Sequence, residues 1–136
     1  MHTTVKMLML WILAIAPGCA LFLREKEIHD VSSYSGSAEC VVLLPQSQIQ
    51  PVHVAPHART VGKMTVGDWK DIVTLIGRLP GLTEEARTIQ WVWCEGTPVT
   101  VIRIALGDPG PYMEVTFTRA RGRWHLAEFG RLTTDR

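Results

Sequence analysis

The second half of the chain is a succession of β-rich segments separated by glycine-containing turns. Four such segments span residues 88–94, 99–106, 112–120 and 124–132. The separators, residues 96–98, 107–111 and 121–122, each contain glycine, which favours tight reversals of the chain. Connections as short as these join antiparallel neighbours. The sequence therefore predicts an antiparallel meander of four strands.

The last hairpin of this meander predicts which side chains share a face of the sheet. A two-residue loop at Arg121-Gly122 would pair Phe117 with Leu126, Thr118 with His125 and Arg119 with Trp124. One face then carries Met113, Val115, Phe117, Trp124 and Leu126, and the other carries Tyr112, Glu114, Thr116, Thr118, His125 and Arg131. Because only the first face is apolar, we expect a second layer to cover it.

A helical pattern of apolar residues stands just before the meander. Trp69, Ile72, Val73, Ile76 and Leu79 follow the spacing i, i+3, i+4, i+7, i+10. Thr65 or Asp68 can cap this helix, and Pro80-Gly81 ends it. We therefore predict a two-layer α+β fold, in which an antiparallel sheet of four to six strands packs on one main helix.

The residues before the helix give weaker signals. Residues 40–44 form a short apolar run stopped by Pro45, which is typical of a central buried strand. Residues 52–54 indicate a second strand at an edge. Residues 45–59 contain Pro45, Pro51 and Pro56, so we otherwise expect a loose segment there.

The N-terminus has the order of an export signal. Lys6 precedes 17 uncharged residues, 7–23, and charged residues resume at Arg24. Pro17-Gly18 breaks the apolar run, which favours a secretory signal over a spanning helix. We expect residues 1–23 to be a signal sequence or membrane anchor, 24–39 a tether rich in serine and glycine, and 40–136 a small α+β domain.

Ala16-Pro17-Gly18-Cys19 resembles the lipobox of bacterial lipoproteins, in which a cysteine after small residues is diacylated and becomes the new N-terminus. Ala16 departs from the leucine or branched residue usual at its position. The resemblance implies lipidation of Cys19, attachment to a membrane through the N-terminus, and a place on the periplasmic or other extracytoplasmic side. The residues leave two alternatives open, an uncleaved anchor and ordinary cleavage after residue 20 with release.

The two remaining cysteines, Cys40 and Cys94, form an even pair in a chain expected to be exported. A disulfide between them is the simplest interpretation. Two buried, unpaired thiols are the alternative, because a sequence does not show whether two Cα atoms lie within bridging distance.

The turn Gly122-Arg123-Trp124 leads into a final amphipathic strand. In this respect the meander resembles the C-terminal part of cone-shaped α+β folds similar to nuclear transport factor 2. Those folds begin with a pair of helices, whereas the residues before position 60 contain prolines and a strand-like run. The resemblance therefore implies nothing about functional residues.

Two tryptophans and two arginines of the meander are candidates for binding. Trp91 and Trp93 share a face with Ile89, so they are either core beneath the helix, the commoner case, or an exposed pair that stacks a sugar or grips a peptide. Arg103 and Arg119 belong to a local excess of cations that suits acidic groups of a partner. The more ordinary interpretation is a solvated hairpin tip, with Arg119 stacked on Trp124.

Glu128 is the one carboxylate that the predicted register places on the apolar face. Burial there would be costly without a partner, and a β-bulge near Ala127 would turn the side chain outward. A buried Glu128 beside Arg103 or Arg119, with His125 nearby, would instead indicate a ligand pocket or a hydrolase-like site.

Charge and missing motifs narrow the function classes. A net charge of +1 disfavours a non-specific nucleic-acid binder. The chain has no phosphate loop, dinucleotide fingerprint or serine elbow, so we expect no cofactor and consider an enzyme the less favoured class. His53 and His57 lie four residues apart, but Pro56 disfavours a helix across them, and we predict no metal site.

These observations predict an exported, lipid-anchored protein of the cell envelope that acts as a non-catalytic binding or assembly module. The expected partner is an envelope protein or peptide. The alternative is a small ligand-pocket or hydrolase-like domain that uses Glu128, His125 and an arginine.

Overall fold

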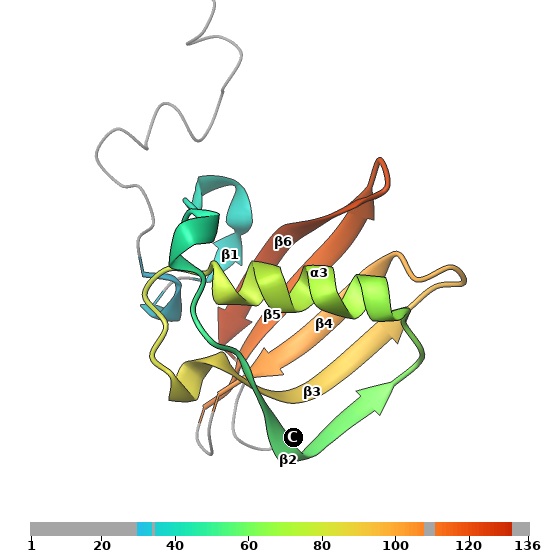
Figure 1. Cartoon of the computed structure of the whole chain (residues 1–136), viewed down its shortest axis with the longest axis horizontal. Coiled ribbons are helices and arrows are strands. Elements are labelled where there is room, and N and C mark those ends of the chain that lie inside the picture. Colours follow the sequence, from blue (N-terminus) through green and yellow to red (C-terminus); the bar gives the residue numbers. More distant parts are fainter. Residues whose placement is uncertain (1–29, 34, 108–110, 132–136) are drawn as a thin grey trace, which may run out of the picture.

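The computed structural model describes residues 30–33, 35–107 and 111–131, which form a two-layer α+β fold (Figure 1). One layer is a six-stranded sheet of β1 (Gly36–Ser37), β2 (His53–Val61), β3 (Thr88–Glu95), β4 (Val101–Leu106), β5 (Met113–Ala120) and β6 (Arg123–Arg131). The other is α3 (Val66–Gly77), which lies across one face of that sheet. Short 3-10 turns are η1 (Val31–Ser33), η2 (Ala38–Cys40), η3 (Gln46–Gln48) and η4 (Glu85–Arg87). The predicted fold class is thus confirmed.

The meander lies in the sheet as predicted. The strand order is β1-β6-β5-β4-β3-β2, and β3 to β6 are antiparallel neighbours. In the last hairpin Phe117 pairs with Leu126, and Arg119 with Trp124, which is the predicted register. Arg121 and Gly122 have φ values of 55° and 74°, so this two-residue loop has the type I′ geometry that matches the twist of paired strands.

Helix α3 packs the predicted apolar stripe onto the sheet. Thr65 is its N-cap, and the Thr65 hydroxyl oxygen accepts a hydrogen bond of 3.0 Å from the backbone N–H of Asp68. Ile72 and Ile76 are fully buried, as is Leu79 just beyond the helix. They pack against the strand residues Ile89, Val92, Ile102, Ile104, Val115 and Phe117, so the core lies between the two layers.

Strand β2 differs most from the expected antiparallel sheet. It runs parallel to β3 at the edge, and α3 is the crossover between the two strands. The edge position of residues 52–54 was predicted, but the strand extends to Val61 through residues expected to be loose. Pro56 is tolerated because the ladder to β3 is interrupted between Val54 and Arg59, where no backbone N–H is required.

The N-terminal part of the fold corrects two predictions. Residues 40–44 are not a central strand, because η2 ends at Cys40 and Val42 is 47% exposed. Residues 31–33 and 35–39, which were assigned to a tether, belong to the folded unit: Val31 is fully buried and β1 pairs with the outer edge of β6. The hydrophobic effect explains the difference, since Val31 and Ala38 fill the core beside α3 and β6.

Among the described residues Cys94 carries a free thiol, and the predicted disulfide to Cys40 is without support. Cys94 lies on β3, whereas Cys40 ends η2, which packs beside β6. The side chain of Cys40 itself lies outside the described residues, as do the predicted signal and Cys19.

Candidate functional site

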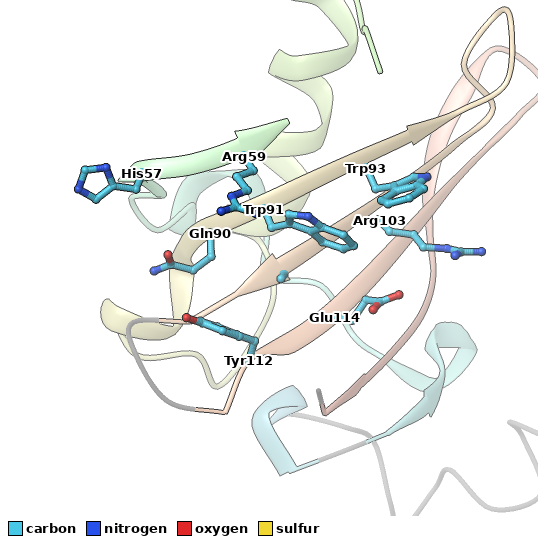
Figure 2. A pocket seen from close by; sticks show the side chains of 9 residues that line it. His57, Arg59, Gln90, Trp91, Trp93, Arg103, Tyr112 and Glu114 are labelled. Atoms are coloured by element: carbon cyan, nitrogen blue, oxygen red, sulfur yellow. The ribbon is translucent and has the colours of Figure 1, made fainter. Parts of the chain in front are cut away.

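The face of the sheet opposite α3 holds a hollow of about 700 Å³ (Figure 2). Its lining comes from four strands and from the residue before β5, and comprises His57, Arg59, Gln90, Trp91, Trp93, Arg103, Ala105, Tyr112 and Glu114. We call this site the Trp91 hollow. Helix α3 covers only the other face of the sheet, so the side chains that line the hollow are accessible to solvent.

Strand register places two rows of these side chains across the sheet. The first row runs Arg59, Trp91, Ala105 and Glu114 through successive Cα partners on β2, β3, β4 and β5. The second row runs Trp93, Arg103 and Thr116. Ala105 is the only small side chain in the first row and is 4% exposed, so it forms the floor between Trp91 and Glu114. The hollow forms because the short side chain of Ala105 is surrounded by longer side chains.

A bulge in β3 turns the tryptophans to the uncovered face. Ile89 pairs with Leu106 and Trp91 with Ala105, so Gln90 is an extra residue on β3. The extra residue sends Ile89 into the core and both tryptophans to the opposite face. The interpretation of Trp91 and Trp93 as core beneath the helix is therefore wrong, because it assumed strict alternation from Ile89. Gln90 is held in place by its Nε2, which donates a hydrogen bond of 2.6 Å to the carbonyl of Gly107.

The two indoles form an angled wall of the hollow. Their ring centroids lie 5.6 Å apart and their planes are tilted by 54°. Trp93 is 39% exposed, and Trp91 is half-buried between its neighbours in the first row. The tilt lets one flat ligand face stack on one indole, while the second indole closes the side.

The charged side chains of the hollow differ in how they are engaged. Nη1 of Arg103 lies 3.3 Å from Oε1 of Glu95 in a half-exposed ion pair. Arg59 is exposed and makes no ion pair with another residue of the described part of the chain. Figure 2 shows Arg59 reaching from β2 toward Trp91, its Cα partner on β3. Arg59 is thus the guanidinium that a bound anion can engage without breaking a contact.

The predicted binding residues separate into four places, one of which holds Arg119 alone. Trp91, Trp93 and Arg103 line the hollow together. His125 is exposed and pairs with Thr118 near the hairpin end of the sheet. Glu128 is exposed and lines a smaller, adjoining hollow of about 300 Å³.

Glu128 has the outward orientation that a bulge was expected to give. Thr116 pairs with Glu128 and Phe117 with Leu126, so Ala127 is the extra residue. Arg103 lies two strands away, beyond Thr116, and the charged pair proposed for a hydrolase-like site is not assembled.

Arg119 lies on the helix side of the sheet, and its prediction as a binding residue is corrected. Its Nη2 donates a hydrogen bond of 2.8 Å to Oδ1 of Asp68, and its guanidinium lies 5.3 Å from the ring centroid of Trp124, confirming the predicted stacking. Asp68 is 5% exposed and also accepts a bond of 3.0 Å from Nε1 of Trp124. These hydrogen bonds, above all that from Trp124, hold the pKa of the Asp68 carboxyl below its ordinary value against the effect of burial. Arg119 therefore joins the hairpin to the start of α3.

Sequence reasoning missed six residues of the lining as site residues: His57, Arg59, Gln90, Ala105, Tyr112 and Glu114. Alternation along β5 placed Tyr112 and Glu114 on the polar face, which was the available signal for them. No comparable signal existed for Arg59, since it stands in a proline-containing segment that was expected to be loose. Its position depends on the parallel pairing of β2 with β3.

The histidines do not form a metal site in the described residues. His53 lies 3.1 Å from Oε1 of Glu84, whereas His57 lines the hollow. No group of three or more histidine, cysteine or acidic side chains suited to a metal ion occurs in residues 30–33, 35–107 and 111–131.

Comparisons with known proteins give no information about the function of this site. No protein-family model matches the chain, and no curated protein or solved structure matches it. None of the helices in the part of the chain that the structure describes is long and apolar enough to span a membrane.

Proposed function

We propose that this chain is an exported, lipid-anchored binding module that holds a component of the cell envelope in the Trp91 hollow without catalysing its conversion. The observation that supports it is the pair of tryptophans on the uncovered face of the sheet, beside Arg59, whose guanidinium makes no ion pair within the described part of the chain. Concave sites that combine aromatic surface with a few placed polar groups are typical of ligand binding. The lipobox-like segment supplies the anchor in this proposal.

Energetics support a binding role for this face. An indole exposed to water forfeits much of the free energy that its burial would contribute, roughly 25 cal/mol per Å² of apolar surface. The fold already has a continuous core between α3 and the sheet, to which Trp91 and Trp93 do not belong. A ligand or partner that covers the two indoles would recover this free energy. An envelope protein or peptide is the partner class that the sequence favours.

Co-sedimentation with envelope fragments tests the binding role. The full chain, extracted in detergent, is mixed with insoluble cell-envelope fragments of the source bacterium, and the pelleted fraction is measured. We expect Ala105→Leu to lower this fraction, because a larger side chain fills the floor of the hollow without removing a polar contact. Arg123→Gln, at the exposed hairpin tip, is the matched control and should pellet like the unaltered chain. Equal pelleting of the Ala105→Leu variant would refute the proposal.

Intact mass tests the anchor independently. We expect the protein purified from its own membranes to begin at Cys19 and to carry a diacylglyceryl group. A full-length chain without lipid would refute lipidation and leave the binding role to be judged by co-sedimentation alone.

A further inference from the structure

We infer that the Trp91 hollow binds an acidic sugar, a ring that carries hydroxyl groups and a carboxylate. This inference depends on the binding role proposed above and names the ligand class of that same site. Three features of the hollow carry it: its shape, its charge, and the polar side chains around its two indoles.

The shape suits a ring lying on an indole. Ala105 leaves space beside Trp91, and the hollow of about 700 Å³ falls in the range that small ligands occupy. The C–H groups on one side of a sugar ring form an apolar surface that packs on an aromatic face. The tilt of 54° between Trp91 and Trp93 leaves one indole as the platform and the other as a side wall.

The charge of the β2 side favours an anion. No aspartate or glutamate occurs between Glu39 and Asp68, so this side of the hollow offers only His57 and Arg59. Arg59 is exposed and makes no ion pair among the described residues, so its guanidinium can bind a carboxylate through two parallel hydrogen bonds. Because Arg59 is the Cα partner of Trp91, the anion would lie beside the ring stacked on the indole.

Acceptors for hydroxyl groups lie on β3, next to the strand of Arg59, and on the β5 side of the hollow (Figure 2). Nε2 of Gln90 is engaged by Gly107, which leaves its Oε1 to accept a hydrogen bond. Glu114 adds carboxylate oxygens at the opposite end of the first row, and the Tyr112 hydroxyl can donate or accept. A carboxylate bound at one end of the row and hydroxyls at the other match an acidic sugar.

The same features disfavour a peptide. An apolar peptide anchor gains most in a fully desolvated pocket, whereas six polar side chains line this hollow. Strand addition at β2 is also disfavoured, because Pro56 lacks an N–H and the ladder is interrupted between Val54 and Arg59. An extended peptide would find no regular row of hydrogen-bonding groups there.

Titration of defined probes into the full chain tests the inference, with tryptophan fluorescence and saturation-transfer NMR as readouts. The probes are trigalacturonate, the neutral maltotriose and the acidic peptide hexaglutamate, and the detergent has no sugar headgroup. We expect trigalacturonate to bind at least about tenfold more tightly than either other probe, because maltotriose lacks the carboxylate and hexaglutamate lacks the sugar ring. Added salt should weaken its binding, because Arg59 is exposed.

Three variants locate the binding. Arg59→Gln and Ala105→Leu should each weaken trigalacturonate binding about tenfold, the first by loss of charge and the second by loss of space. Arg123→Gln removes an exposed arginine elsewhere and should change the affinity less than about twofold. Circular dichroism of each variant verifies that the fold is retained.

Each negative result would overturn a different part of the proposal. Equal binding of trigalacturonate and maltotriose would overturn the role of Arg59, and tighter binding of hexaglutamate would replace the sugar by an acidic peptide. Absence of sugar binding, with envelope pelleting still sensitive to Ala105→Leu, would overturn this inference and keep the proposed function. Insensitivity of both measurements to Ala105→Leu would overturn both.

Discussion

Replacement of Asp68 by asparagine should destabilise the fold in a pH-dependent way. Asp68 is buried in the first turn of α3, where its Oδ1 accepts hydrogen bonds from Trp124 at 3.0 Å and Arg119 at 2.8 Å. Both donors come from the last hairpin. The carboxylate is therefore the polar link between the N-terminal end of the helix and the far end of β5 and β6.

The structure gives the magnitude of this effect. An asparagine keeps one carbonyl oxygen for the indole N–H but loses the charge, and a hydrogen bond to a charged group is worth about 1 kcal/mol more than a neutral one. The ion pair with Arg119 adds up to about 1 kcal/mol, because the side chain of Arg119 is 34% exposed and screened by water. We expect Asp68→Asn to lower the free energy of unfolding by about 2 kcal/mol.

The direction of the pH dependence follows from the pKa of Asp68. Hydrogen bonding from Trp124, together with Thr65 and Arg119, holds this pKa below the ordinary value of 3.8 in the folded state. A carboxyl whose folded pKa is depressed contributes stability above its unfolded pKa and loses it as pH falls through the folded one. The contribution of Asp68 is therefore complete at neutral pH, begins to decline near pH 3.8, and is lost as the pH falls through the lower pKa of the folded state.

Urea unfolding at pH 7 and at pH 3, followed by circular dichroism, measures both quantities. Asp71→Asn is the control, since Asp71 lies exposed on the same helix. We expect the free-energy difference between Asp68→Asn and the unaltered chain to be about 2 kcal/mol at pH 7 and smaller at pH 3. An equal loss in the two variants, or a loss from Asp68→Asn that does not shrink in acid, would refute the reasoning.

Three further measurements test other parts of the fold. Arg121→Asn should raise the free energy of unfolding by about 0.5–1 kcal/mol in a urea titration, because asparagine tolerates the positive φ of 55° better than arginine. Gly81→Ala should lower the midpoint of the same titration, since its φ is +73° and an added Cβ would overlap the Cα of Asp30. Cys94 should react with iodoacetamide at pH 8 more slowly than a free cysteine, because burial, reinforced by the Asp68 carboxylate, raises the pKa of its thiol above 9.0.

The meander and the helix could be predicted because their signals are local. Alternation with period two assigned Val115 and Phe117 to the covered face, and the Arg121-Gly122 turn fixed the pairing of β5 with β6. Each signal lies within about ten residues, so no knowledge of distant contacts was required. The four strands of the meander, β3 to β6, and α3 therefore agree with prediction to within a few residues at each end.

The N-terminal half was predicted poorly because distant partners decide its structure. Val31 is buried by the turn after α3, and its backbone N–H donates to the carbonyl of Pro80 at 3.2 Å. The pairing of β1 with β6 joins residues almost a hundred positions apart. Composition suggested a tether here, because serine and glycine suit a linker as well as the short turns and two-residue strand that form.

The candidate site also depends on structure that local patterns do not reveal, namely a bulge in β3 and the crossover through α3. The bulge at Gln90 decides that Trp91 faces outward, and a single extra residue in β3 leaves no mark in the alternation around it. The crossover through α3 then decides that Arg59 becomes the neighbour of Trp91. The presence of Arg59 and Trp91 in the sequence therefore does not show that their side chains are neighbours. Because the guanidinium is useful only beside the indole, the binding role that we propose depends on this parallel pairing, and the Arg59→Gln titration tests the pairing together with the chemistry.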